Sequence, residues 1–189
     1  MLAAALAIQL VHDASKTSIE RARRQYVMDT IQQIIPGTPG NNMAADVIHW
    51  QTERFFSEPQ SLRIYRGRQN GSPDGIVLLP VTVEGYNGPI KMAIGIKRDG
   101  HISGVTILSD RETAGLGAAI DSSRSDWLQQ FRGHSLKQPG KANWKLAQEG
   151  GKFDAISGAT NSSAAVLDAV RAALEFYAAN EQAVYRQND

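Results

Sequence analysis

Residues 90–109 read IKMAIGIKRDGHISGVTILS and contain two apolar, β-branched runs joined by a short polar step. The first run is Ile90–Lys97 and the second is His101–Ser109. Arg98, Asp99 and Gly100 lie between them, and an Asp-Gly step between two such runs is a strong signal for a β-hairpin. The stretch therefore predicts two neighbouring antiparallel strands.

Two further strand-like runs precede this hairpin. Leu62–Arg68 (LRIYRGR) alternates between apolar and polar residues, as a half-buried strand does. Gly75–Glu84 (GIVLLPVTVE) is apolar and β-branched, and its Pro80 indicates a sheet edge or a bulge because proline has no N–H to donate. Together the four runs predict an antiparallel sheet of roughly four strands.

A helical pattern precedes the strands, from about Thr17 to Ile35. Ser15 or Thr17 can cap this helix, and the Pro-Gly step at position 36 ends it. The residues expected on its apolar face are Ile19, Ala22, Tyr26, Ile31 and Ile34.

Two helices are predicted after the strands. Ser125–Phe131 (SDWLQQF) is typical of a short helix capped by Ser125, and Ser162 to about Ala179 is typical of a long amphipathic one. The expected core face of the long helix consists of Val166, Ala169, Val170, Ala173, Leu174 and Tyr177. The fold class is therefore α+β, an antiparallel sheet flanked by helices.

Composition excludes several functions. Lys and Arg number 20 against 19 Asp and Glu, which argues against a nucleic-acid partner because such proteins carry a basic face. The chain has no cysteine, so thiolate metal sites, iron–sulfur clusters and a cysteine nucleophile are excluded. Its four histidines are scattered, so no metal site is predicted.

The first residues, Met1–Val11 (MLAAALAIQLV), are apolar but too few to cross a bilayer, which takes about 20 residues. They lack the basic start and cleavage site of a signal peptide. Two interpretations remain: a buried first helix, or the last half of a membrane anchor whose start is missing from this chain.

The stretch Asp154–Thr160 (DAISGAT) is the most informative for function. It predicts a loop, a glycine hinge and then the hydroxyl-rich start of the long helix. Helix N-termini favour phosphate, because their first N–H groups are unpaired and the helix dipole is positive there. A hydroxyl at Thr160 would place a phosphoester beside those amides, but from local physics alone an ordinary helix cap explains the same residues.

A second unusual stretch, Asp110–Gly117 (DRETAGLG), follows the predicted hairpin. Two glycines around a leucine predict a tight turn with exposed amides, which could embrace a planar ring or a phosphate. The turn could equally be a simple connection, since a lone Gly-x-Gly is weak evidence.

Taken together, the two stretches resemble the FMN-binding domain shared by two related proteins. These are the G subunit of the Rnf ion-translocating electron-transport complex and the C subunit of the sodium-translocating NADH:quinone reductase. The family's Asp followed by Ser/Thr-Gly-Ala-Thr matches Asp154 and Ser157-Gly158-Ala159-Thr160. Its Glu-Thr-Pro-Gly-Leu-Gly matches Glu112–Gly117, with Ala114 in place of the proline, which should loosen the turn.

The order of the supporting pieces favours the Rnf member. They are Gly85–Ile90 (GYNGPI), Asp126-Trp127, and Gly150-Gly151-x-Phe153-Asp154. The resemblance covers the last half to two-thirds of the chain. It also makes sense of the N-terminal helix as the stalk after a single membrane anchor.

The resemblance implies that FMN is esterified through its phosphate to Thr160 by a flavin transferase that uses FAD, and that Asp154 belongs to the sequence the transferase reads. No catalytic residue is implied. The expected cofactor contacts besides Thr160 are Glu112, Thr113, Gly115, Leu116, Gly117, Ser157, Gly158 and Ala159.

The resemblance also implies a place in a larger assembly. The complex passes electrons between ferredoxin and NAD and couples this flow to ion movement, so the expected partners are other membrane subunits. Residues 1–35 would form the end of a single-pass anchor and the stalk, and residues 36–189 the covalent FMN domain. We expect that domain on the periplasmic face of the inner membrane. The basic residues after the anchor favour the opposite orientation, but long domains translocate largely regardless of such charges.

Two alternatives share these residues. One is a related extracytoplasmic protein with covalent FMN that serves another electron chain. The other is a flavin-free binding or assembly module in which Thr160 only caps a helix.

Overall fold

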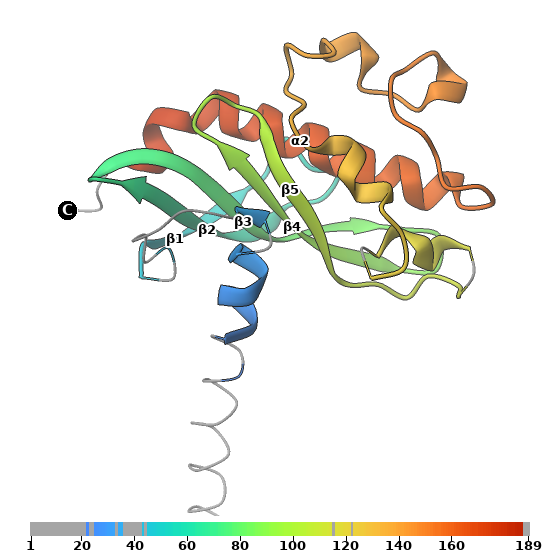
Figure 1. The fold of residues 1–189 in the computed structure, drawn as a ribbon, viewed down its shortest axis with the longest axis horizontal. Coiled ribbons are helices and arrows are strands. Elements are labelled where there is room, and N and C mark those ends of the chain that lie inside the picture. The colour runs from blue at the N-terminus through green and yellow to red at the C-terminus, as the bar shows by residue number, and fades with distance from the viewer. Residues whose placement is uncertain are drawn as a thin grey trace, which may run out of the picture.

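The computed structural model describes residues 22, 25–32, 34–35, 43, 45–114, 116–121 and 123–186. Its centre is a five-stranded antiparallel sheet in which each strand pairs with the next along the chain. The strands are β1 (Val47–Thr52), β2 (Gln60–Gln69), β3 (Ser72–Glu84), β4 (Pro89–Lys97) and β5 (Ile102–Ser109). One long helix, α2 (Thr160–Tyr185), follows, and Figure 1 shows it lying along one face of the sheet.

The predicted fold class is confirmed, with two corrections to its elements. The sheet has five strands because β1 (VIHWQT) also pairs, although its mixed polarity gave no clear alternating pattern. The predicted short helix is a 3-10 helix, Trp127–Phe131, and Asp126 holds the N-cap position. The hydroxyl of Ser125 still accepts from the first amide of this helix, that of Trp127 (3.3 Å), as a capping residue does. Three more 3-10 helices, Gly117–Ile120, Lys141–Asn143 and Ala147–Glu149, lie in the segment before α2.

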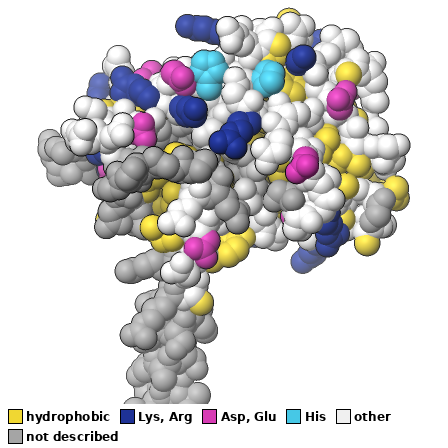
Figure 2. Space-filling model, viewed as in Figure 1, with side chains coloured by type: hydrophobic (Ala, Val, Ile, Leu, Met, Phe, Trp, Pro, Cys, Tyr) yellow, Lys and Arg dark blue, Asp and Glu magenta, His cyan; other side chains and the backbone are white. Residues whose placement is uncertain are grey.

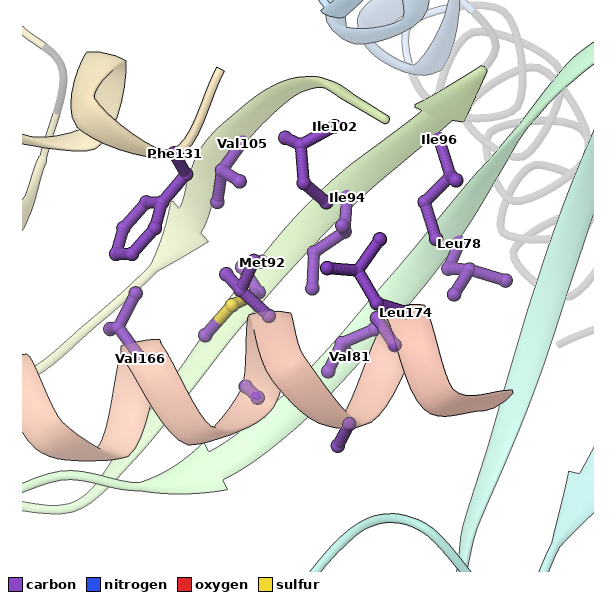
Figure 3. Packing of buried hydrophobic residues seen from close by; sticks show 14 of the residues in the cluster. Leu78, Val81, Met92, Ile94, Ile96, Ile102, Val105, Phe131, Val166 and Leu174 are labelled. Carbon is purple, nitrogen blue, oxygen red and sulfur yellow. The ribbon is translucent and has the colours of Figure 1, made fainter. Parts of the chain in front are cut away.

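The main core lies between the sheet and α2. Side chains from all five strands point toward the helix, and Figure 3 shows Val166 and Leu174 of α2 over Met92 and Val81. All six residues expected on the core face of the helix are buried. The 3-10 segment contributes to the same cluster, where Phe131, Trp144 and Phe153 pack ring against ring.

A bulge in β3 keeps its apolar side chains on the core face. Leu78 pairs with Ile94 and Val81 pairs with Met92, so two residues of β3 stand opposite one of β4. The extra residue shifts the alternation by one position, and Leu78 and Val81 therefore face the same cluster. Pro80 lies within this bulge, where its missing N–H removes no ladder hydrogen bond, as its sequence context predicted.

The second face of the sheet is covered by helical residues 25–32 and 34 (blue in Figure 1). Val27, Ile31 and Ile34 pack there against sheet residues that include Val77 and Ala93. The predicted apolar face is therefore wrong by one position at Tyr26, which is 51% exposed while Val27 is buried. Ala22 is exposed as well, and Ile19 lies outside the described residues.

Two facing glycines form the seat of this helix. Gly95 of β4 pairs with Gly104 of β5. A Cβ atom at Gly104 would lie 3.2 Å from the carbonyl oxygen of Ile34, and one at Gly95 would collide with the Cγ2 methyl of Ile34 and with Ser103. The absence of side chains at Gly95 and Gly104 therefore lets Ile34 pack directly on the strand backbones, where it is only 1% exposed.

The C-terminal end of α2 is held by two arginines of β2. Nη1 of Arg66 donates to the carbonyls of Val184 (3.2 Å) and Arg186 (2.9 Å), and Nη2 of Arg68 donates to that of Tyr185 (3.3 Å). Both arginines also pair with Asp46. These cations satisfy carbonyls that a helix C-terminus leaves unpaired and complement the negative end of its dipole.

No helix among the described residues is long and apolar enough to cross a membrane. On the face drawn in Figure 2, Lys and Arg side chains are interspersed with Asp and Glu. The interspersion agrees with the balanced charge of the sequence.

Substitution at the glycine seat tests this packing. Gly95→Ala should lower the free energy of unfolding by about 1–3 kcal/mol, because the new methyl group meets Ile34 in a filled core. Ile34→Ala alone should cost about 2–5 kcal/mol. The double variant should lose less than the sum, since Ile34→Ala removes the methyl that the new Cβ meets. Urea denaturation measures the unfolding free energy of all three variants. A loss in the double variant that equals the sum of the two single losses to within about 0.5 kcal/mol would contradict this packing of Ile34 on Gly95.

Candidate functional site

Thr160 is the first residue of α2, and the N-cap is Ala159. Gly158 precedes them at φ +77, a left-handed conformation that turns the chain into the helix and that glycine adopts without strain. Ser163 ties the turn to the helix, because its hydroxyl accepts from the amide of Ile156 (3.0 Å) and donates to the carbonyl of Ala159 (2.9 Å). The motif is therefore a fixed turn on a rigid helix.

No side chain caps this helix start. Within the described part of the chain, no group accepts a hydrogen bond from the amides of Thr160, Asn161 or Ser162. Alanine is among the poorest N-cap residues, and a missing cap costs about 1 kcal/mol. The helix thus presents free N–H groups and the positive end of its dipole at Thr160. The interpretation of Thr160 as a simple capping residue does not fit this geometry.

A hollow of about 370 Å³ opens at these amides. Three segments that are distant in sequence meet there: the turn after β3, the segment after β5, and the start of α2. The lining residues are Tyr86, Glu112, Thr113, Leu116, Gly117, Gly158, Ala159, Thr160, Asn161 and Ser162.

Two large apolar side chains of the hollow are open to solvent. Tyr86 is 72% exposed and Leu116 is 47% exposed. A Cβ atom at Gly158 would lie 2.9 Å from Cδ2 of Leu116, so the glycine leaves room where the two turns meet. Apolar side chains beside free amides give the hollow one face suited to a ring and another suited to an anion.

Glu112 links all three segments. Its Oε1 accepts from the amide of Asn87 (3.2 Å) and its Oε2 accepts from the hydroxyl of Ser162 (2.8 Å). Gly85 and Gly117 flank this carboxylate, and a Cβ atom on either one would collide with it. The second glycine of the Gly-Leu-Gly turn is therefore required by the side chain of Glu112.

Asn87 adds a second link between the turn after β3 and the segment after β5. Its side-chain amide donates to the hydroxyl of Thr113 (2.6 Å). The carbonyl of Thr113 accepts in turn from the amides of Leu116 (3.1 Å) and Ala118 (3.2 Å). The prediction that the amides of this turn are exposed is thus wrong for Leu116, whose amide the turn itself uses.

Asp154 lies just before the motif and is pinned by its backbone. Its amide donates to Oε1 of Gln130 (2.8 Å), and its carbonyl accepts from the indole of Trp127 (2.8 Å) and from Gln130 (3.2 Å). The residue is exposed, and among the described residues none donates to its carboxylate. A fixed backbone with an open carboxylate is a geometry that a partner protein could read.

The structure brings together most of the residues singled out from the sequence. Glu112, Thr113, Leu116, Gly117, Gly158, Ala159 and Thr160 all line the hollow. Ser157 is exposed and is not among the lining residues, and Gly115 lies outside the described residues.

Sequence reasoning did not assign Tyr86, Asn161 and Ser162 to the site. Tyr86 belongs to the Gly85–Ile90 piece and Ser162 to the hydroxyl-rich helix start, both of which were noted as parts of a pattern. Their position beside the hollow follows from the pairing of β3 with β4 and from the bond between Ser162 and Glu112.

Comparison with known proteins gives concordant matches. A family model described as an FMN-binding domain matches residues 85–175. The G subunit of the ion-translocating oxidoreductase complex of Vibrio atlanticus is 33% identical over 181 residues, which are 95% of this chain and 86% of the relative. The corresponding protein of Pseudoalteromonas atlantica is 31% identical over 179 residues, 94% of this chain and 83% of the relative. That of Vibrio cholerae is 28% identical over 180 residues.

These relatives match nearly the whole chain, and they confirm the resemblance drawn from the two motifs. The chain belongs to the family of G subunits of ion-translocating oxidoreductase complexes.

Proposed function

We propose that this chain is the electron-transfer subunit of a membrane-bound ion-translocating oxidoreductase complex and carries FMN as a phosphoester on Thr160. The observation that carries the proposal is the uncapped start of α2, where Thr160 borders the hollow beside three free amides. A hydroxyl that borders a hollow at such a place can hold a phosphate covalently while the amides offset its charge.

The residues of the hollow fit FMN. Its volume of about 370 Å³ lies within the range of ligand pockets, about 300–1,000 Å³. The amides of Thr160, Asn161 and Ser162 would hold the phosphate, and the exposed side chains of Tyr86 and Leu116 offer apolar surface for the ring. Gly158 lets Leu116 lie against the turn, because a Cβ atom there would lie 2.9 Å from Cδ2 of Leu116 and would push this exposed side chain aside.

Attachment requires a flavin transferase and FAD. The hydroxyl oxygen of Thr160 forms a bond to the FMN phosphorus as the anhydride bond of FAD breaks, AMP leaves with the electron pair, and the hydroxyl proton is released. The pinned backbone and open carboxylate of Asp154 support its role as part of the sequence that the transferase reads. No acid or base is needed in the hollow itself.

Bound FMN supplies one- and two-electron redox chemistry. The role of this chain is to hold and partly expose that group. The α2 helix anchors the attachment point to the core, and the links from Glu112 and Asn87 fix the surrounding turns. Such a seat suits a relay, because a rigid site minimises rearrangement when the charge of the cofactor changes.

The wider setting is part of the proposal. Residues 1–35 would form the end of a single-pass anchor and a stalk, and residues 36–189 the FMN domain on the periplasmic face of the inner membrane. The partners would be the other membrane subunits, with electrons passing between ferredoxin and NAD. The names of the relatives support the complex. The seat of Ile34 against the sheet supports a stalk that is firmly joined to the domain.

Covalent attachment is tested by producing the full chain together with a flavin transferase. The native chain should gain the mass of one FMN less one water and should fluoresce on a denaturing gel, because a phosphoester survives denaturation. Thr160→Ala should do neither, and Ser61→Ala, which removes an exposed hydroxyl on β2 outside the hollow, is the control that should still be labelled. Label on Thr160→Ala, or none on the native chain, would overturn the attachment.

Glycine substitutions test the shape of the hollow. Gly158→Ala should reduce the fraction of chain that is loaded with flavin, because its methyl group meets Leu116. Gly133→Ala is the control, since Gly133 has the same φ of +77 but no atom within 4 Å of its added Cβ. Both variants should lose about 1–2 kcal/mol of unfolding free energy from backbone strain. Equal loading of the two variants, measured by intact mass, would contradict the proposed shape.

A further inference from the structure

The carboxylate of Glu112 lies beside the amides proposed to hold the flavin phosphate. Its Oε2 is 2.8 Å from the hydroxyl of Ser162, whose own amide is one of the three free N–H groups. Glu112 is also the one carboxylate among the described residues that line the hollow. A carboxylate at this place complements the positive end of the helix dipole, and it repels a second anion that binds beside it.

Glu112 has little freedom to move away. Both of its oxygens accept hydrogen bonds, and Gly85 and Gly117 enclose the side chain so closely that no Cβ could be added to either. The hydroxyl of Ser162 is spent on this carboxylate and is therefore not free to donate to a phosphate. The negative charge is thus held in place by the same contacts that assemble the hollow.

This fixed charge discriminates between two forms of the same phosphate. Free FMN is a phosphomonoester with a charge of about −1.5 to −2 at neutral pH. Once esterified to Thr160 it is a phosphodiester with a single negative charge, like the phosphates of a nucleic-acid backbone. Repulsion by Glu112 and attraction by the three amides both scale with the charge of the ligand. The helix N-terminus carries only about +0.5 elementary charge against the −1 of the carboxylate, so the site opposes the second negative charge of free FMN.

We propose that Glu112 is a specificity-determining residue that disfavours free FMN and tolerates the singly charged ester. The inference rests on the proposed function, because it takes the hollow to be the flavin site. In consequence the hollow stays clear of free FMN until the transferase delivers the cofactor, and the free hydroxyl of Thr160 remains available for the ester bond.

The test measures binding of three flavins to the full chain produced without a transferase and shown by mass to be unmodified. The probes are FMN, riboflavin 4′,5′-cyclic phosphate, which carries one negative charge, and uncharged riboflavin. Fluorescence titration gives each dissociation constant for the native chain, for Glu112→Gln and for Glu181→Gln. Glu181→Gln is the control, because Glu181 lies on α2 about 30 Å from Thr160 and therefore far from the hollow.

The native chain should bind the cyclic phosphate more tightly than FMN. Glu112→Gln should tighten FMN binding on the order of tenfold and leave riboflavin binding unchanged. The effect on FMN should become smaller as the salt concentration rises. Glu181→Gln should match the native chain.

Three results would overturn the proposal: an unchanged FMN affinity in Glu112→Gln, an equal change for FMN and riboflavin, or no FMN binding to that variant. If Glu112→Gln fails to fold, the native chain alone tests the proposal. A native chain that binds FMN as tightly as the cyclic phosphate, or more tightly, overturns the proposal. A failure of covalent attachment would instead appear in the mass of the transferase-treated chain, which is a separate measurement.

Discussion

The free N–H groups at the start of α2 are the feature on which the site depends. An uncapped end costs a helix about 1 kcal/mol, and here the remaining contacts of the helix outweigh that cost. A dozen residues of α2 are buried, and one fully buried Val or Leu side chain alone contributes about 1.5–3 kcal/mol. Arg66 and Arg68 satisfy carbonyls at the other end. The helix is thus well supported everywhere except where the proposed phosphate would bind.

The hollow beside those amides is built from contacts between segments that are far apart in sequence. Glu112 and Asn87 carry these contacts, and Gly85 and Gly117 make room for them. The glycines of the motif therefore serve side-chain packing as much as the approach of a ligand. Glu112 assembles the site and, under our proposal, also sets which charge state of the ligand the site prefers.

The sequence predicted the elements that have strong periodicity or turn signals. The β4–β5 hairpin, the bulge at Pro80 and the core face of α2 are all as expected, because alternation and helical spacing report directly on burial. Strand β1 was missed since its His, Trp and Gln give no clear pattern. The predicted apolar face of the N-terminal helix was wrong at Tyr26. Tyr26 and Val27 are neighbours, and only packing against Val77 and Ala93 decides which of the two is buried.

For the site, the sequence yielded the lining residues that lie within recognisable motifs, but not how they are joined. No local pattern indicates that Glu112 accepts from Ser162, 50 residues away. Nor does one indicate that Ala159 rather than a hydroxyl residue is the N-cap. Both facts depend on the tertiary fold, and the second rules out the interpretation of Thr160 as the N-cap.

Site-resolved mass spectrometry tests the central claim most directly. Trypsin should release residues 153–171 as one peptide, which contains Thr160 together with Ser157, Ser162 and Ser163. After maturation by a flavin transferase, fragmentation should locate one FMN phosphoester on Thr160 and none on the three serines. An FMN on any of those serines, or a peptide without FMN from a chain that is otherwise fully folded, would contradict the account.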